Sequence, residues 1–113
     1  MVEFDKNIVV SNLQYTVKDG WENLVFMAGY NDTLVLKNSL NLNKKIVVEE
    51  GAKVELIDYI FDNNQSNEVQ YQIEVHGNLK LHHVYLCAVE QNKVNVVSSV
   101  FGMGNYTNTV IDL

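Results

Sequence analysis

The sequence predicts an all-β fold, and two observations support this prediction. Short runs of alternating apolar and polar residues extend through the 113-residue chain, and clusters of Asn, Asp and Gly separate these runs. The runs that start at Val54, Leu79 and Val94 also share an apolar–x–apolar beginning that is then interrupted. Such repeated patterns, at irregular intervals of about 15 to 25 residues, are typical of an imperfect β-helix. A β-sandwich is the alternative, because short strands with frequent turns are also typical of sandwiches.

The alternating runs place the expected strands along the chain. They are Ile8–Val10, Thr33–Leu36, Ile46–Val48, Val54–Leu56, Val69–Val75, Leu79–Leu81, Val84–Leu86, Val94–Val97 and Thr109–Ile111. Segments such as GYND, EEGAK and GMGN lie between them and suit tight turns. One segment, DGWENLVFMAG, is compatible with a helical turn, because Asp19 is a suitable cap and Gly29 a suitable stop.

The interruptions of the alternation predict where each coil turns a corner. They fall at Ile57–Asp58, His82–His83 and Ser98–Ser99. A break in a period of two changes which side chains point inward, and bends or bulges have this effect. On this interpretation Leu56, Leu81 and Val96 occupy equivalent positions and stack as an interior ladder, and one of the two adjacent imidazoles points outward.

Composition limits the possible partners. The formal net charge is −6, and all eight basic residues are lysines. Without arginine the chain lacks the usual side chain for bidentate recognition of phosphates and bases, so nucleic acid is not an expected partner. The Lys44–Lys45 doublet, close to Glu49 and Glu50, is interpreted as part of a solvated turn.

The length predicts a single domain over residues 1–113. No apolar run approaches the roughly 18 residues of a membrane span, and the first residues lack the pattern of a signal peptide. The only cysteine, Cys87, excludes an internal disulfide and fits a reducing compartment. We therefore expect a cytoplasmic protein that has no membrane contact.

Candidate metal ligands are His76, His83 and Cys87. Strict alternation would place His83 and Cys87 on one strand face, with His76 arriving from the adjacent coil, and such nitrogen and sulfur ligands suit zinc or iron. Their spacing matches no closed zinc motif, so the histidines are interpreted as structural and no stably bound cofactor is expected. No catalytic residue is assigned, because carboxylates such as Asp58 and Asp62 lie beside turn residues.

Two stretches, NKKIVVEEGAKVELIDYIFDNN and the segment from VQYQIEVHGNLKLHHVY to the end of the chain, carry a family resemblance. Residues 50–57, 77–84 and 101–113 occupy the places of successive coils in the SufB/SufD family of iron–sulfur cluster assembly scaffolds. The resemblance spans about residues 43–113. It implies a right-handed parallel β-helix and a non-enzymatic role that depends on protein–protein association.

The same resemblance implies the partners. Members of the family pair through the β-helical core, so a second copy or a SufB/SufD-like protein is expected. They also act with the SufC ATPase, but the helical docking segment follows the core in the family, so we do not expect SufC to bind residues 1–113. An iron–sulfur cluster is implied only by the family, and no functional residue is carried over. Two alternatives are a β-solenoid interaction module unrelated to cluster assembly and, with less support, a small metal-binding protein.

The last expected strand predicts self-association. The segment NTVIDL is apolar at Val110, Ile111 and Leu113, with no polar cap or lysine-rich edge. Solenoids need a cap on their terminal coil, and open strand edges are templates for pairing. The expected result is a symmetric dimer with a contact that includes residues 100–113. A short stand-alone relative and a piece of a longer protein are both compatible with this sequence.

Overall fold

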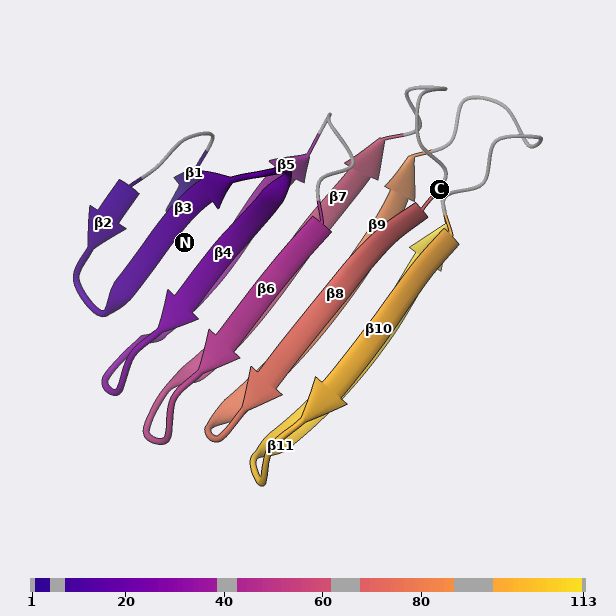
Figure 1. The fold of residues 1–113 in the computed structure, drawn as a ribbon. Helices are drawn as coiled ribbons and strands as arrows, with labels where there is room; N and C mark the ends of the chain where they lie inside the picture. Colours follow the sequence, from indigo (N-terminus) through magenta and orange to yellow (C-terminus); the bar gives the residue numbers. More distant parts are fainter. Residues whose placement is uncertain (1, 5–7, 39–42, 62–67, 87–94, 113) are drawn as a thin grey trace.

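All regular elements of the computed structural model are β-strands, which confirms the all-β class (Figure 1). The structure describes residues 2–4, 8–38, 43–61, 68–86 and 95–112. The strands are β1 (Val2–Phe4), β2 (Ile8–Val10), β3 (Leu13–Lys18), β4 (Trp21–Phe26), β5 (Asn31–Asn38), β6 (Asn43–Val48), β7 (Lys53–Phe61), β8 (Glu68–Val75), β9 (Asn78–Leu86), β10 (Asn95–Phe101) and β11 (Asn105–Asp112). No helix in these described ranges could cross a membrane.

The strands form two sheets that lie face to face. One has five strands in the order β1-β5-β7-β9-β11, and the other has six in the order β10-β8-β6-β4-β3-β2. From β4 onward the chain alternates between the sheets, and neighbours within each sheet are parallel. Figure 1 shows β4, β6, β8 and β10 side by side, with the strands of the other sheet behind them. Among the strands that the structure describes, only β2–β3 and β3–β4 pair antiparallel.

The period-two pattern fills the space between the sheets. Alternate residues of each strand point inward, and because the strands pair in parallel register, inward residues of successive strands stack on one another. For example, Leu34 of β5 pairs with Leu56 of β7, which pairs with Leu81 of β9. All three are fully buried. A single apolar cluster joins both sheets.

Tight turns at one end of the sheets bring successive backbones into contact. Asn78 N donates to Ala52 O at 2.9 Å, and Asn105 N donates to Gly77 O at 2.9 Å. A Cβ atom on Gly77 would collide with the carbonyl oxygens of Ala52 and Glu49. Glycine is therefore required at this turn because a neighbouring backbone occupies the space of a side chain.

The expected helical turn in DGWENLVFMAG is wrong, because the segment contains strand β4. Asp19 and Gly20 have φ angles of 54° and 79°, and Lys18 pairs with Trp21 across them. Two successive positive φ values are typical of a type I′ hairpin turn, for which Asp-Gly is a favoured sequence. The dipeptide is thus a hairpin signal rather than a helix cap.

The expected coil corners are also wrong. Strand β7 continues through Ile57–Asp58 and β9 continues through His82–His83. These two pairs are equivalent, as expected, because Ile57 pairs with His82 and Asp58 with His83. The alternation is not broken at these sites. Asp58 and His83 are polar residues at inward positions, and both are fully buried.

The expected interior ladder is confirmed in part. Leu56 and Leu81 stack in register, but Val96 lies in the other sheet, where it pairs with Val69. The reason is that consecutive strands belong to opposite sheets, so the strand that follows β9 in its own sheet is β11. The register partner of Leu81 there is Asn108. Likewise, Ser98–Ser99 is equivalent to Tyr71–Gln72 and not to His82–His83.

Candidate functional site

The two described metal-ligand candidates occupy different environments. His76 lies in the turn between β8 and β9, where its exposed imidazole Nε2 is 3.1 Å from Glu74 Oε2. His83 lies well inside β9, fully buried between the sheets. Cys87 is outside the described residues, so the proposed trio stays a prediction. Within the described part of the chain, no group of three His, Cys, Asp or Glu residues is placed to hold a metal ion.

The adjacent histidines face opposite ways, as the sequence predicted. His82 points to the outer face of the five-stranded sheet, with its Nε2 3.4 Å from Glu55 Oε2. His83 points inward and meets the Tyr71 ring edge-on, with the two ring centroids 4.8 Å apart. The pair therefore belongs to two different sites.

Lys44 is fully buried, so the interpretation of the Lys44–Lys45 doublet as a solvated turn is wrong for its first residue. Lys44 Nζ is 3.1 Å from Asp58 Oδ2, and Asp58 is likewise fully buried rather than in a solvated loop. The Tyr71 hydroxyl donates to the same Asp58 oxygen. Lys45 is exposed, with its ammonium group 5.2 Å from the centre of the Trp21 ring. A buried charge needs a partner, and Lys44 finds one on the opposite sheet.

Five inward polar residues form what we call the interior polar column: Glu22, Lys44, Asp58, Tyr71 and His83. Register explains their proximity, because Glu22 pairs with Lys44 and Lys44 with Tyr71 in one sheet, while Asp58 pairs with His83 in the other. Glu22 also accepts a hydrogen bond of 3.0 Å from the Tyr15 hydroxyl. All five are almost or completely buried, so this column does not meet a substrate from solvent.

Burial also changes the acidity of the polar column. Desolvation raises the pKa of Glu22 above its ordinary 4.5, although the charge of Lys44 opposes this effect. Desolvation lowers the pKa of His83 below 6.5, opposed by the nearby Asp58 carboxylate. Both shifts favour the neutral form of the side chain. The stability contribution of Glu22 is therefore present below pH 4.5 and is lost as the pH rises through its folded-state pKa.

Acidification is expected to destabilise the protein through His83. Its folded-state pKa is below the ordinary 6.5, so the stability from the neutral ring is present above pH 6.5 and is lost as the pH falls through the folded-state pKa. Urea unfolding at about pH 7.5 and about pH 5.5 measures this loss, which His83→Gln should reduce. His82→Gln, on the outer face of the same strand, is the matched control. Equal pH dependence in the two variants would contradict the assignment.

Strands β10 and β11 form an exposed end of the two-sheet stack. Among the described strands, β10 pairs only with β8 and β11 only with β9. Among the residues of β10 and β11 that are register partners of buried inward residues, four are exposed and define what we call the end face: Ser98, Val100, Asn108 and Val110. Val110 is 57% exposed, whereas its partner His83 is 0% exposed. Val100 is 41% exposed, whereas its partner Ile73 is 0% exposed.

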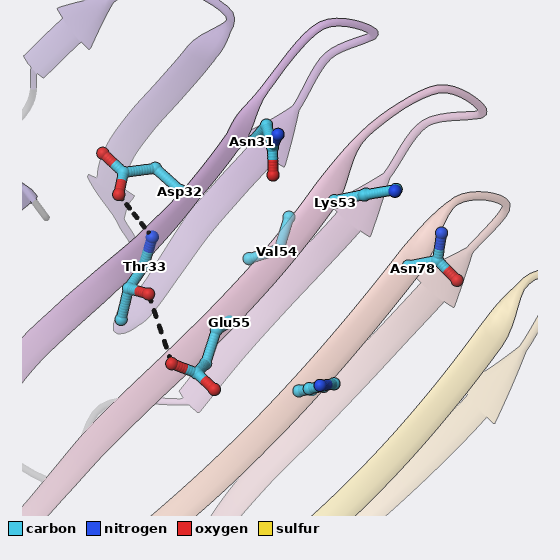
Figure 2. A pocket seen from close by; sticks show the side chains of 8 residues that line it. Asn31, Asp32, Thr33, Lys53, Val54, Glu55 and Asn78 are labelled. Atoms are coloured by element: carbon cyan, nitrogen blue, oxygen red, sulfur yellow. Dashed lines mark hydrogen bonds between the residues drawn. The ribbon is translucent and has the colours of Figure 1, made fainter.

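A polar groove of about 640 Å³ crosses the outer face of the five-stranded sheet (Figure 2). We call it the outer groove. It lies where β5, β7 and β9 begin, after the tight turns, and its lining residues are Asn31, Asp32, Thr33, Lys53, Val54, Glu55, Asn78 and Lys80. It carries amide, ammonium and carboxylate groups on three neighbouring strands, and such groups can bind a polar ligand from solvent.

Sequence reasoning missed the interior polar column, although the signal was present. Lys44 is in phase with Ile46 and Val48, just as His83 is in phase with Leu79 and Leu81. Extending each apolar alternation by two residues toward its polar end places these side chains inward. The outer groove had no comparable signal, since its residues come from three strands whose pairing the sequence does not reveal.

Comparisons of the chain with protein-family models, with curated proteins and with solved structures find no match.

Proposed function

We propose that this chain is a non-enzymatic scaffold that acts by protein–protein association and has the architecture of a right-handed parallel β-helix. The parallel pairing of alternate strands supports this architecture, because each strand returns beside an earlier strand of its own sheet. Crossover connections between parallel strands are right-handed in about 98% of cases. A scaffold also suits the polar column, whose acid–base groups are buried.

The observation that carries the proposal is the end face. Val100 and Val110 are the register partners of the buried residues Ile73 and His83, yet both valines are substantially exposed. The free edges of β10 and β11 add backbone groups that can pair with another strand. Exposed apolar groups beside unpaired strand edges are typical of association surfaces.

A second copy of the chain is the partner that we propose for the end face. Although the chain carries a net charge of −6, Ser98, Val100, Asn108 and Val110 are all uncharged. Two copies can therefore meet through this surface without bringing like charges together. A two-fold arrangement uses the same patch on both copies and closes the assembly as a dimer.

The resemblance over residues 43–113 supports a more specific role in iron–sulfur cluster assembly in the cytoplasm. A SufB/SufD-like protein would then offer a β-helical end similar to that of a second copy. SufC is not an expected direct partner of these residues. Mixing the purified chain with SufB-, SufD- and SufC-type proteins tests this role by light scattering. Self-association without any such complex would favour an interaction module unrelated to cluster assembly.

Replacing Val110 with lysine is expected to weaken self-association by at least about tenfold, because the ammonium group would be buried without a partner. Light scattering over a concentration series should show dimers for the wild-type chain and monomers for Val110→Lys. Thr109→Lys is the matched control. Thr109 pairs with the outward His82, so this substitution adds the same charge on the other side of β11. A wild-type chain that stays monomeric at high concentration would refute association through the end face.

A further inference from the structure

The carboxylates of the outer groove are already engaged by other groups. Asp32 Oδ1 accepts a hydrogen bond of 2.7 Å from the Thr33 backbone N–H. Glu55 Oε1 accepts one of 3.2 Å from the Thr33 hydroxyl, and Glu55 Oε2 lies 3.4 Å from His82 Nε2. Figure 2 shows these two bonds of Thr33 on one side of the groove. The Glu55 carboxylate thus has partners in Thr33 and His82 and forms no ion pair with Lys80, its direct register partner on β9.

Besides the two carboxylates, the lining of the groove carries the ammonium groups of Lys53 and Lys80 and the side-chain amides of Asn31 and Asn78. No described carboxylate forms an ion pair with Lys53 or Lys80, the two ammonium groups of the lining. Asn78 Oδ1 accepts a bond of 2.7 Å from Asn105 Nδ2, so the amide nitrogen of Asn78 is the donor left for a ligand. Figure 2 shows the Lys53 side chain extending toward the strand that carries Asn78.

Register brings these three donors together. Asn78 is the direct partner of Lys53 across β7 and β9, and Lys80 lies two residues further along β9 on the same face. With strands about 4.8 Å apart and a rise of about 3.3 Å per residue, the Cα atoms of Lys53 and Lys80 are about 8 Å apart. Two lysine side chains can easily converge across this distance. An amide donor beside them completes a site that presents N–H groups from two strands.

We propose that the outer groove binds an oxyanion, the carboxylate or phosphate group of a small ligand, between Lys53 and Lys80. An anion is the ligand that two ammonium groups with an amide donor beside them recognise, and ammonium-to-oxyanion hydrogen bonds are the strong ones. The site lies on the outer face of the five-stranded sheet and uses no end-face residue. It is therefore independent of the proposed self-association.

Titration of the ¹⁵N-labelled chain with inorganic phosphate, and separately with acetate, at low ionic strength tests the site by NMR. We expect saturable shifts of the Asn78 side-chain amide and of the Lys53 and Lys80 backbone amides. In the Lys53→Gln/Lys80→Gln variant, binding should weaken by at least roughly tenfold, because two charge-assisted bonds are lost. Saturation by either anion supports the site, and the more tightly bound anion identifies the ligand group.

Lys18→Gln is the matched control, because it removes an exposed lysine of β3 outside the groove and should leave the titration unchanged. Spectra of the variants without anion establish that they are folded. Shifts that do not saturate with either anion would overturn the proposal. So would shifts that persist in the double variant, or an equal loss of affinity in Lys18→Gln.

Discussion

Replacing Lys44 with alanine is expected to destabilise the protein by about 3 to 5 kcal/mol. The substitution would leave the Asp58 carboxylate, which is 0% exposed, without the ammonium group that lies 3.1 Å away. The Tyr71 hydroxyl would remain as a donor to Asp58, but it carries no charge to compensate the carboxylate. Urea unfolding at neutral pH measures the change in the free energy of unfolding.

Lys45→Ala is the matched control for this prediction. Lys45 follows Lys44 in β6 but is exposed, and its contact with the Trp21 ring should contribute only about 0.5 to 1 kcal/mol. A variant that replaces Lys44 with methionine and Asp58 with leucine removes both charges, and it should be less destabilised than Lys44→Ala. Equal losses for Lys44→Ala and Lys45→Ala would contradict the buried ion pair.

Replacing Leu81 with alanine should cost about 2 to 5 kcal/mol. Leu81 is fully buried and stacks on Leu56 in the five-stranded sheet, so truncation leaves a cavity between the two sheets. Chemical unfolding again gives the loss, and Lys80→Ala, one residue earlier on the outer face of β9, is the control. A loss below about 1 kcal/mol would mean that Leu81 is not a core residue, since core truncations cost more than this.

The strands were largely predictable because their signal is local. Alternation in Val69–Val75 identifies β8, which the structure extends by one residue to Glu68. Strand β4 was missed because the Asp-Gly dipeptide before it was interpreted as a helix cap. A local rule on hairpin turns would have corrected this error. Strand β9 was divided in two because His82–His83 was interpreted as a corner.

The sequence pointed to one of the candidate sites, the surface at the last strand, and not to the outer groove. The apolar pattern of the last strand predicted an association surface over residues 100–113, and this association stays a prediction, although Val110 is exposed in the single chain. The outer groove was beyond prediction, because Lys53 and Lys80 become neighbours only when β7 pairs with β9. The pairing of distant strands depends on the packing of the whole chain and not on either segment alone.

The sequence by itself determined that the chain folds into short β-strands, and it determined which of their side chains share a face, because a period of two is a property of each strand. The tertiary structure alone decided which strands share a sheet. It therefore decided that Leu81 stacks with Asn108 and not with Val96. It also decided the burial of Lys44, because the large cost of removing an ammonium group from water is offset only by Asp58, which the next strand supplies from the opposite sheet.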